Sequence, residues 1–259
     1  MRCSDLLIVV LAVFAFAAKA IAESIPVRHN QKPMHRFMVA RSDDGKTIAS
    51  GEFTQVVHGS QVMMRLTYRF GDGSIDDEET TYTQGGTFRL VSNHHLQKGP
   101  FFTKPVDFTV HAATGTVTFR SVDRDGKVHD QSKHMALPAD LANGMVGTLL
   151  LNVPHDTAPF RVGMLAAVGG GRLVHLEVSP QSDQTVQLGG QTFQATVFRV
   201  HPVLGSIVSL FARMIGLQPK DVTVWVLEGD DPAVAVVIGQ LGGYGPVVSS
   251  DLVGTDFAK

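Results

Sequence analysis

Apolar and polar residues alternate along much of this chain from about residue 36 onward. Gln61–Phe70 is the clearest run, because every second residue in it is apolar or aromatic: Val62, Met64, Leu66, Tyr68 and Phe70. A strand with one buried face requires this period of two. Similar runs cover residues 48–57, 88–96, 106–110, 117–119, 160–168, 172–179, 185–188, 191–200, 221–228 and 233–240. Glycine- and aspartate-rich turns separate them, so the pattern predicts an antiparallel meander.

Two stretches break the alternation. Residues 138–153 open with Pro138 and Asp140, which suit a helix N-terminus, and then become almost wholly apolar. Asn143-Gly144 interrupts this stretch, so we expect a short helical segment followed by an extended run. Residues 203–217 carry apolar side chains at three- and four-residue spacings, which predicts an amphipathic helix ended by Pro219.

These patterns together predict a mainly β fold. We expect one large curved antiparallel meander, an open or incomplete barrel, with one or two short helices on its concave side, near residues 138–150 and 203–217. Neither a linker nor a low-complexity tract divides residues 36–259, so a single β domain is expected there. Residues 23–35 have few apolar side chains and are predicted to form a flexible N-terminal arm.

Residues 1–22 have the features of an export signal. Arg2 precedes an uninterrupted apolar run, Leu6–Ala18, and Ala20-Ile21-Ala22 supplies a small–x–small cleavage pattern. The run would make about 20 Å of helix, short of the ~30 Å hydrocarbon core of a bilayer. We therefore expect cleavage, a periplasmic or secreted protein, and no transmembrane span after cleavage. A retained anchor is the alternative, since Lys19 interrupts the approach to the cut.

Composition excludes several classes of function. The formal net charge is −2, and it becomes −3 when Arg2, Lys19 and Asp5 leave with the signal, so no basic surface for nucleic acid is expected. Cys3, the single cysteine, lies within the predicted signal. Thiol catalysis and thiolate metal sites are therefore not expected in the mature chain.

The candidate catalytic motifs are weak. The chain has 11 histidines, but His94-His95 and the pair His129/His134 would point to opposite faces of a strand, so we expect no metal site. There is no GxSxG motif, and Gly169-Gly170-Gly171 precedes a predicted strand and not a helix. We expect no enzyme activity and no cofactor.

The apolar content is the positive signal. Methionine is frequent for a sheet protein, and methionine lines sites that accept varied apolar ligands. In its layout the chain resembles the periplasmic lipid- and lipoprotein-carrier half-barrels and a group of uncharacterised exported bacterial β-rich proteins. The segments that carry the resemblance are His94–Phe102, Leu137–Met145 and Gly239–Val248. The resemblance implies binding of an acyl chain or another apolar molecule, without chemistry.

Our leading hypothesis is an exported, non-catalytic binding module that holds a hydrophobic ligand, a lipid or acyl chain, on the concave face of the sheet. The expected ligand-binding residues are Met64, Phe88, Leu90, His94, Phe108, Phe211 and Met214. His94 is included because strict alternation places it on the face of Phe88 and Leu90. One alternative is a cell-envelope scaffold with a solidly packed sheet that binds an envelope protein. Another is a hydrolase centred on His94, His155 or His175.

Overall fold

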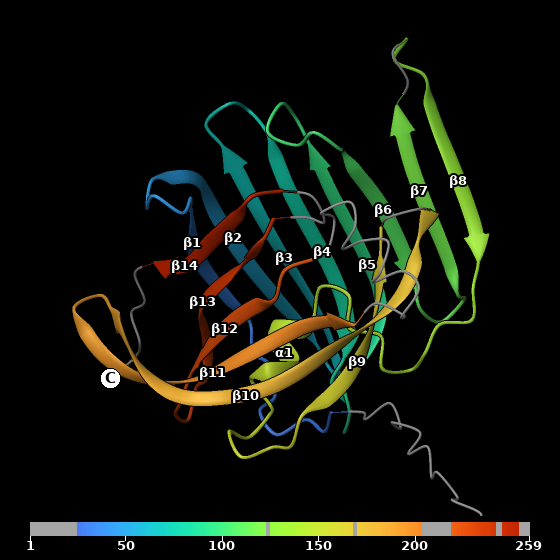
Figure 1. Cartoon of the computed structure of the whole chain (residues 1–259). Coiled ribbons are helices and arrows are strands. Elements are labelled where there is room, and N and C mark those ends of the chain that lie inside the picture. The colour runs from blue at the N-terminus through green and yellow to red at the C-terminus, as the bar shows by residue number, and fades with distance from the viewer. Residues whose placement is uncertain (1–24, 123–124, 168–169, 204–218, 242–244, 254–259) are drawn as a thin grey trace, which may run out of the picture.

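The computed structural model describes residues 25–122, 125–167, 170–203, 219–241 and 245–253 (Figure 1). Its strands are β1 (Met34–Arg41), β2 (Thr47–His58), β3 (Gln61–Phe70), β4 (Ile75–Thr83), β5 (Arg89–Lys98), β6 (Val106–His111), β7 (Thr116–Val122), β8 (Val128–His134), β9 (Phe160–Ala166), β10 (Arg172–Leu188), β11 (Gln191–Val203), β12 (Val222–Leu227), β13 (Ala233–Gln240) and β14 (Val247–Val253). The helix α1 (Val146–Leu150) lies between β8 and β9 in sequence.

The strands form one antiparallel sheet in the order β8-β7-β6-β5-β4-β3-β2-β1-β14-β13-β12-β11-β10-β9. Two meanders, β1–β8 and β9–β14, are joined where β1 pairs with β14, for example Met38 with Leu252. The sheet curls so that β9–β12 cross in front of β2–β5, with α1 between them (Figure 1). β8 and β9 are not paired with each other, so the barrel is incomplete. The predicted fold class is confirmed.

The alternating pattern builds the concave core. Val62, Met64, Tyr68 and Phe70 of β3 are buried, whereas the residues between them are more exposed. The main apolar cluster joins both walls of the barrel, since it contains Val62 of β3 and Val224 of β12 together with Leu149 of α1. Burial of this many apolar side chains from both walls is what holds the curled sheet together.

Residues 138–151, which we call the plug, fill one half of the concave side. Their helical part is shorter than the predicted segment, because Gly144 has a φ of 67° and residues 140–143 bond to the edge strand β9 instead. The Asn143 side chain pairs with the backbone of Leu165: its Nδ2 donates to the carbonyl and its Oδ1 accepts from the amide, both at 2.8 Å. The plug therefore satisfies backbone groups that the open edge of β9 would leave unpaired.

Residues 25–31, part of the predicted flexible arm, make specific contacts with the rest of the domain. Ile25 is buried in the main cluster, and its carbonyl accepts a hydrogen bond from Phe88. The amides of Arg28 and His29 both donate to Oδ1 of Asn152, at 2.8 and 2.7 Å. Residues 25–31 thus dock on the domain because the Asn152 side chain, just after the plug, and the backbone of Phe88 bind their backbone. The predicted helix at residues 203–217 falls outside the described residues beyond Val203.

Candidate functional site

Four of the predicted ligand-binding residues lie together in the main apolar cluster. Their exposed fractions are 9% for Met64, 4% for Phe88, 7% for Leu90 and 3% for Phe108. The plug residues Leu141, Met145 and Leu149 belong to the same cluster. The side chains therefore contact protein atoms and belong to a packed core. Phe211 and Met214 lie outside the described residues.

One small cavity lies at the interface between the plug and the barrel. Its volume is about 10 Å³, and Ile25, Phe88, Asp140, Leu141, Met145, Leu149 and Val162 line it. That volume is sufficient for one water molecule and far too small for an acyl chain. An acyl chain therefore does not fit in this cavity while the plug is in place.

His94 lies on the convex face, contrary to the prediction that placed it beside Phe88 and Leu90. The cause is a β-bulge in β5: Thr81 pairs with Ser92 and Tyr82 with Leu90, so Val91 is an extra residue. An extra residue reverses which side chains face the core beyond it. Asn93, His95 and Gln97 consequently face the concave side.

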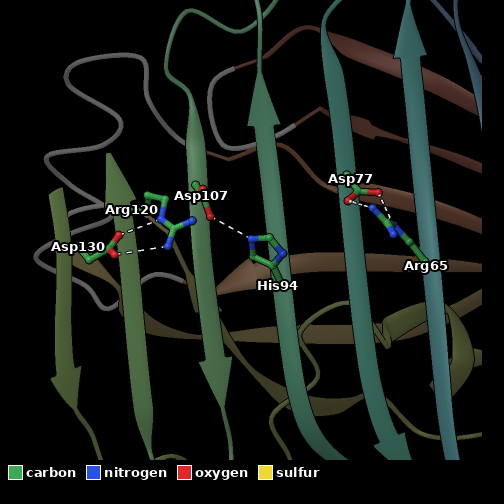
Figure 2. A network of polar contacts seen from close by, with 6 residues as sticks. All are labelled: Arg65, Asp77, His94, Asp107, Arg120 and Asp130. Atoms are coloured by element: carbon green, nitrogen blue, oxygen red, sulfur yellow. Dashed lines mark hydrogen bonds and ion pairs between the residues drawn. The ribbon is translucent and has the colours of Figure 1, made fainter. Parts of the chain in front are cut away.

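The convex face carries ion pairs between neighbouring strands of β3–β8 (Figure 2). Arg65 of β3 donates twice to the Asp77 carboxylate at 2.8 Å, His94 of β5 contacts Asp107 at 2.9 Å, and Arg120 of β7 contacts Asp130 at 2.9 Å. Burial raises the pKa of Asp77, but hydrogen bonds from Arg65 and Thr67 outweigh it and hold the pKa below its usual value. These opposite charges pair across neighbouring strands.

A group of polar side chains faces the concave side next to the plug. We call Asp76 and Glu78 of β4 with His95 and Gln97 of β5 the polar strip. Nε2 of His95 donates to Oδ1 of Asp76 at 2.8 Å, and Nε2 of Gln97 donates to the other carboxylate oxygen at 3.0 Å. The side chains of His95 and Asp76 are only 21% and 10% exposed. The strip therefore contains a largely buried ion pair.

The protonation state of His95 follows from these neighbours. Burial lowers its pKa, but the hydrogen bond to Asp76 and the negative charges of Glu78, Asp76 and Asp77 act in the other direction and raise it to about 9. His95 is therefore an imidazolium at neutral pH. Its ring also meets the edge of Phe108, with centroids 6.1 Å apart.

Glu78 has a different environment from Asp76. Its Oε1 accepts a hydrogen bond from Nδ2 of Asn93 at 3.0 Å. Within the described ranges no Lys, Arg or His nitrogen lies within ion-pair distance of Glu78, although the charge of His95 acts on it from the neighbouring strand. Gly144 of the plug packs directly against Glu78 and Thr80. A Cβ added at Gly144 would lie 2.0 Å from Oγ1 of Thr80 and 3.1 Å from Oε1 of Glu78.

Apolar side chains flank the polar strip on both sides. The strand registers place Leu66, Glu78, His95, Phe108 and Phe119 in one row across β3–β7. In the next row, away from the plug, Tyr68, Asp76, Gln97 and Val106 follow each other. Leu66, Val106 and Phe119 keep partial exposure, whereas the rows under the plug are buried. The strip and these three residues form the candidate site.

In the part of the chain that the structure describes, no group of three or more His, Cys, Asp or Glu side chains is placed to hold a metal ion. No described helix is long and apolar enough to cross a membrane. Sequence reasoning missed His95 because a β-bulge leaves no clear signal in one sequence. Adjacent acids such as Glu78 and Glu79 give no sign in the sequence of which one faces the interior, and β4 directs Glu78 to the concave side and Glu79 to the convex side.

No protein-family model matches the chain, and no curated protein matches it in sequence. A solved structure described as a β-barrel-like protein of the domain of unknown function DUF1849, from Brucella abortus, is similar to it at 12% identity with a TM-score of 0.45. That alignment covers 92% of this chain and 100% of the other.

Proposed function

We propose that this protein is an exported, non-catalytic binding module that carries a hydrophobic ligand, a lipid or acyl chain, on the concave face of its incomplete barrel. The ligand lies over Leu66, Val106 and Phe119, beside the polar strip, and not among the packed residues Met64, Phe88, Leu90 and Phe108. Export rests on the signal features of residues 1–22.

One observation carries the proposal: partly exposed apolar side chains continue the rows of a concave core that is otherwise filled. Val106 and Phe119 pack against the main cluster and keep partial exposure, although Phe119 also lies against Gly171, just before β10, and has Nζ of Lys133 5.9 Å from its ring centroid. A concave, mainly apolar surface with a few polar groups at a fixed place is typical of sites for small amphiphilic molecules. The same fold offers a rigid wall, because β3–β7 are continuously paired.

The packed half of the concave side favours a second function, a cell-envelope scaffold that binds a protein partner. The plug fills the space between Phe88 and Val162 down to the 10 Å³ cavity. Such a scaffold needs no interior site, so the two functions differ in whether a small apolar molecule binds at all.

The test is titration of a delipidated preparation with a fluorescent fatty acid. We expect saturable binding at micromolar concentration. Val106→Glu should weaken it by about tenfold or more, because a carboxylate would stand where the acyl chain lies. Thr109→Glu is the matched control, since Thr109 is also half-buried on β6 but faces the convex side.

The outcomes separate the two functions. Saturable binding lost in Val106→Glu and kept in Thr109→Glu supports the carrier. No binding of several such probes by the wild type contradicts the carrier and leaves the scaffold. Binding that both variants retain contradicts the proposed site over Val106.

A further inference from the structure

We infer that the ligand carries a singly charged amine head, and that Glu78 is the residue that recognises it. This inference rests on the proposed function, since it names the chemical class that the same concave site takes. It starts from the charges and hydrogen bonds of the polar strip.

The strip has a net charge of −1 at neutral pH. Asp76 is neutralised by the His95 imidazolium at 2.8 Å, and Gln97 binds its second oxygen. Glu78 accepts a hydrogen bond from the side-chain amide of Asn93, which is neutral. The charge of His95 also acts on Glu78 from the neighbouring strand, so one imidazolium serves two carboxylates and the strip keeps one unbalanced negative charge, which is costly on a half-buried surface.

A second observation lies beside Glu78. Asn93 is fully buried, and its Nδ2 donates to both Oε1 of Glu78 and Oγ1 of Thr80, each at 3.0 Å. Its Oδ1 has no hydrogen-bond partner among the described residues. One buried acceptor at the place where the plug meets the strip therefore lacks a donor among the described residues.

In the described part of the chain no Lys or Arg nitrogen lies within ion-pair distance of Glu78; Lys133 of β8, which also faces the concave side, has its Nζ over the Phe119 ring and donates to the carbonyl of Gly171. Arg36 of β1 belongs to the same row, opposite Phe53, but two strands, β2 and β3, lie between it and Glu78, so three strand spacings, about 14 Å, separate them. Its guanidinium donates to the carbonyl of His35. An ammonium group has three hydrogen-bond donors and one positive charge, so it complements both the acceptor oxygens and the negative charge of Glu78.

The apolar surroundings decide what else the ligand must contain. Leu66 stands directly opposite Glu78 on β3, and Phe108 stands opposite His95 on β6. An alkyl chain attached to the amine can therefore lie along partly exposed apolar side chains while the head reaches Glu78. A fatty acid places a negative head beside two carboxylates and should bind less well.

The experiment compares three ligands with the same chain, dodecylamine, dodecanol and dodecanoate, as competitors of the fluorescent fatty acid. We expect the amine to bind about tenfold more tightly than the alcohol, and the carboxylate to bind most weakly. Glu78→Gln should weaken the amine about tenfold and leave the alcohol unchanged. Glu79→Gln is the control, since it removes the same charge from the next residue of β4, on the convex face.

The results distinguish this inference from the proposed function. If the three competitors bind equally, or if Glu78→Gln and Glu79→Gln weaken the amine alike, the amine head is wrong and the carrier stands. If none of the three competes and the probe does not bind, the proposed function itself is wrong. If Glu78→Gln does not fold, the relative affinities of the wild type for dodecylamine, dodecanol and dodecanoate still test the amine head.

Discussion

Replacing His95 with glutamine should remove a pH-dependent part of the stability. The folded protein raises the pKa of His95 from 6.5 to about 9. A raised pKa means that the folded state holds the proton more tightly than the unfolded state. The stabilisation is therefore complete below pH 6.5 and is lost as the pH rises through about 9. The difference between the His95 pKa of the folded state and that of the unfolded state corresponds to at most about 3 kcal/mol in the free energy of unfolding.

Urea unfolding from pH 6 to pH 10 measures this contribution. The free energy of unfolding of the wild type minus that of His95→Gln should fall by about 2–3 kcal/mol across this window. His94→Gln is the matched control, because His94 is 42% exposed on the convex face and its removal leaves the His95–Asp76 pair intact. A difference between wild type and His95→Gln that stays constant within about 0.5 kcal/mol would refute the reasoning.

Two further substitutions test the packing. Gly51→Ala should lower the free energy of unfolding by about 1–3 kcal/mol, because its new Cβ would lie 2.6 Å from Cε1 of Tyr68. Gly71→Ala, where nothing lies within 4 Å, is the control, and equal urea midpoints for the two variants would contradict the argument. Asn143→Ala should cost about 2 kcal/mol or more and speed amide exchange at Leu165, whose buried backbone groups lose both partners. Unchanged exchange at Leu165 would show that the plug does not cover the edge of β9.

Much of the fold could be predicted from alternation alone. β3 shows why: its apolar residues recur at every second position from Val62 to Phe70, and the structure buries that face. β4 (Ile75–Thr83) escaped prediction because its core-facing positions include Asp76, Glu78 and Thr80. A strand that presents polar side chains to the interior lacks the hydrophobic periodicity on which such predictions depend.

The candidate site could not be predicted for two physical reasons. The bulge at Val91 shifts the alternation of β5 by one residue, so His95 faces the concave side and His94 faces the solvent. The plug then decides which apolar residues stay accessible, since Met64 and Leu90 are covered whereas Val106 is not. Tertiary contacts of this kind are invisible in local sequence patterns.

Photoaffinity labelling tests the central claim most directly. A fatty acid with a photoactivatable group in its chain is bound to the delipidated protein, irradiated, and its adducts are mapped by mass spectrometry. We expect adducts on the concave residues of β3, β6 and β7, at Leu66, Val106 and Phe119. Adducts confined to convex residues, or a lack of specific adducts at saturating ligand, would contradict a ligand site on the concave face.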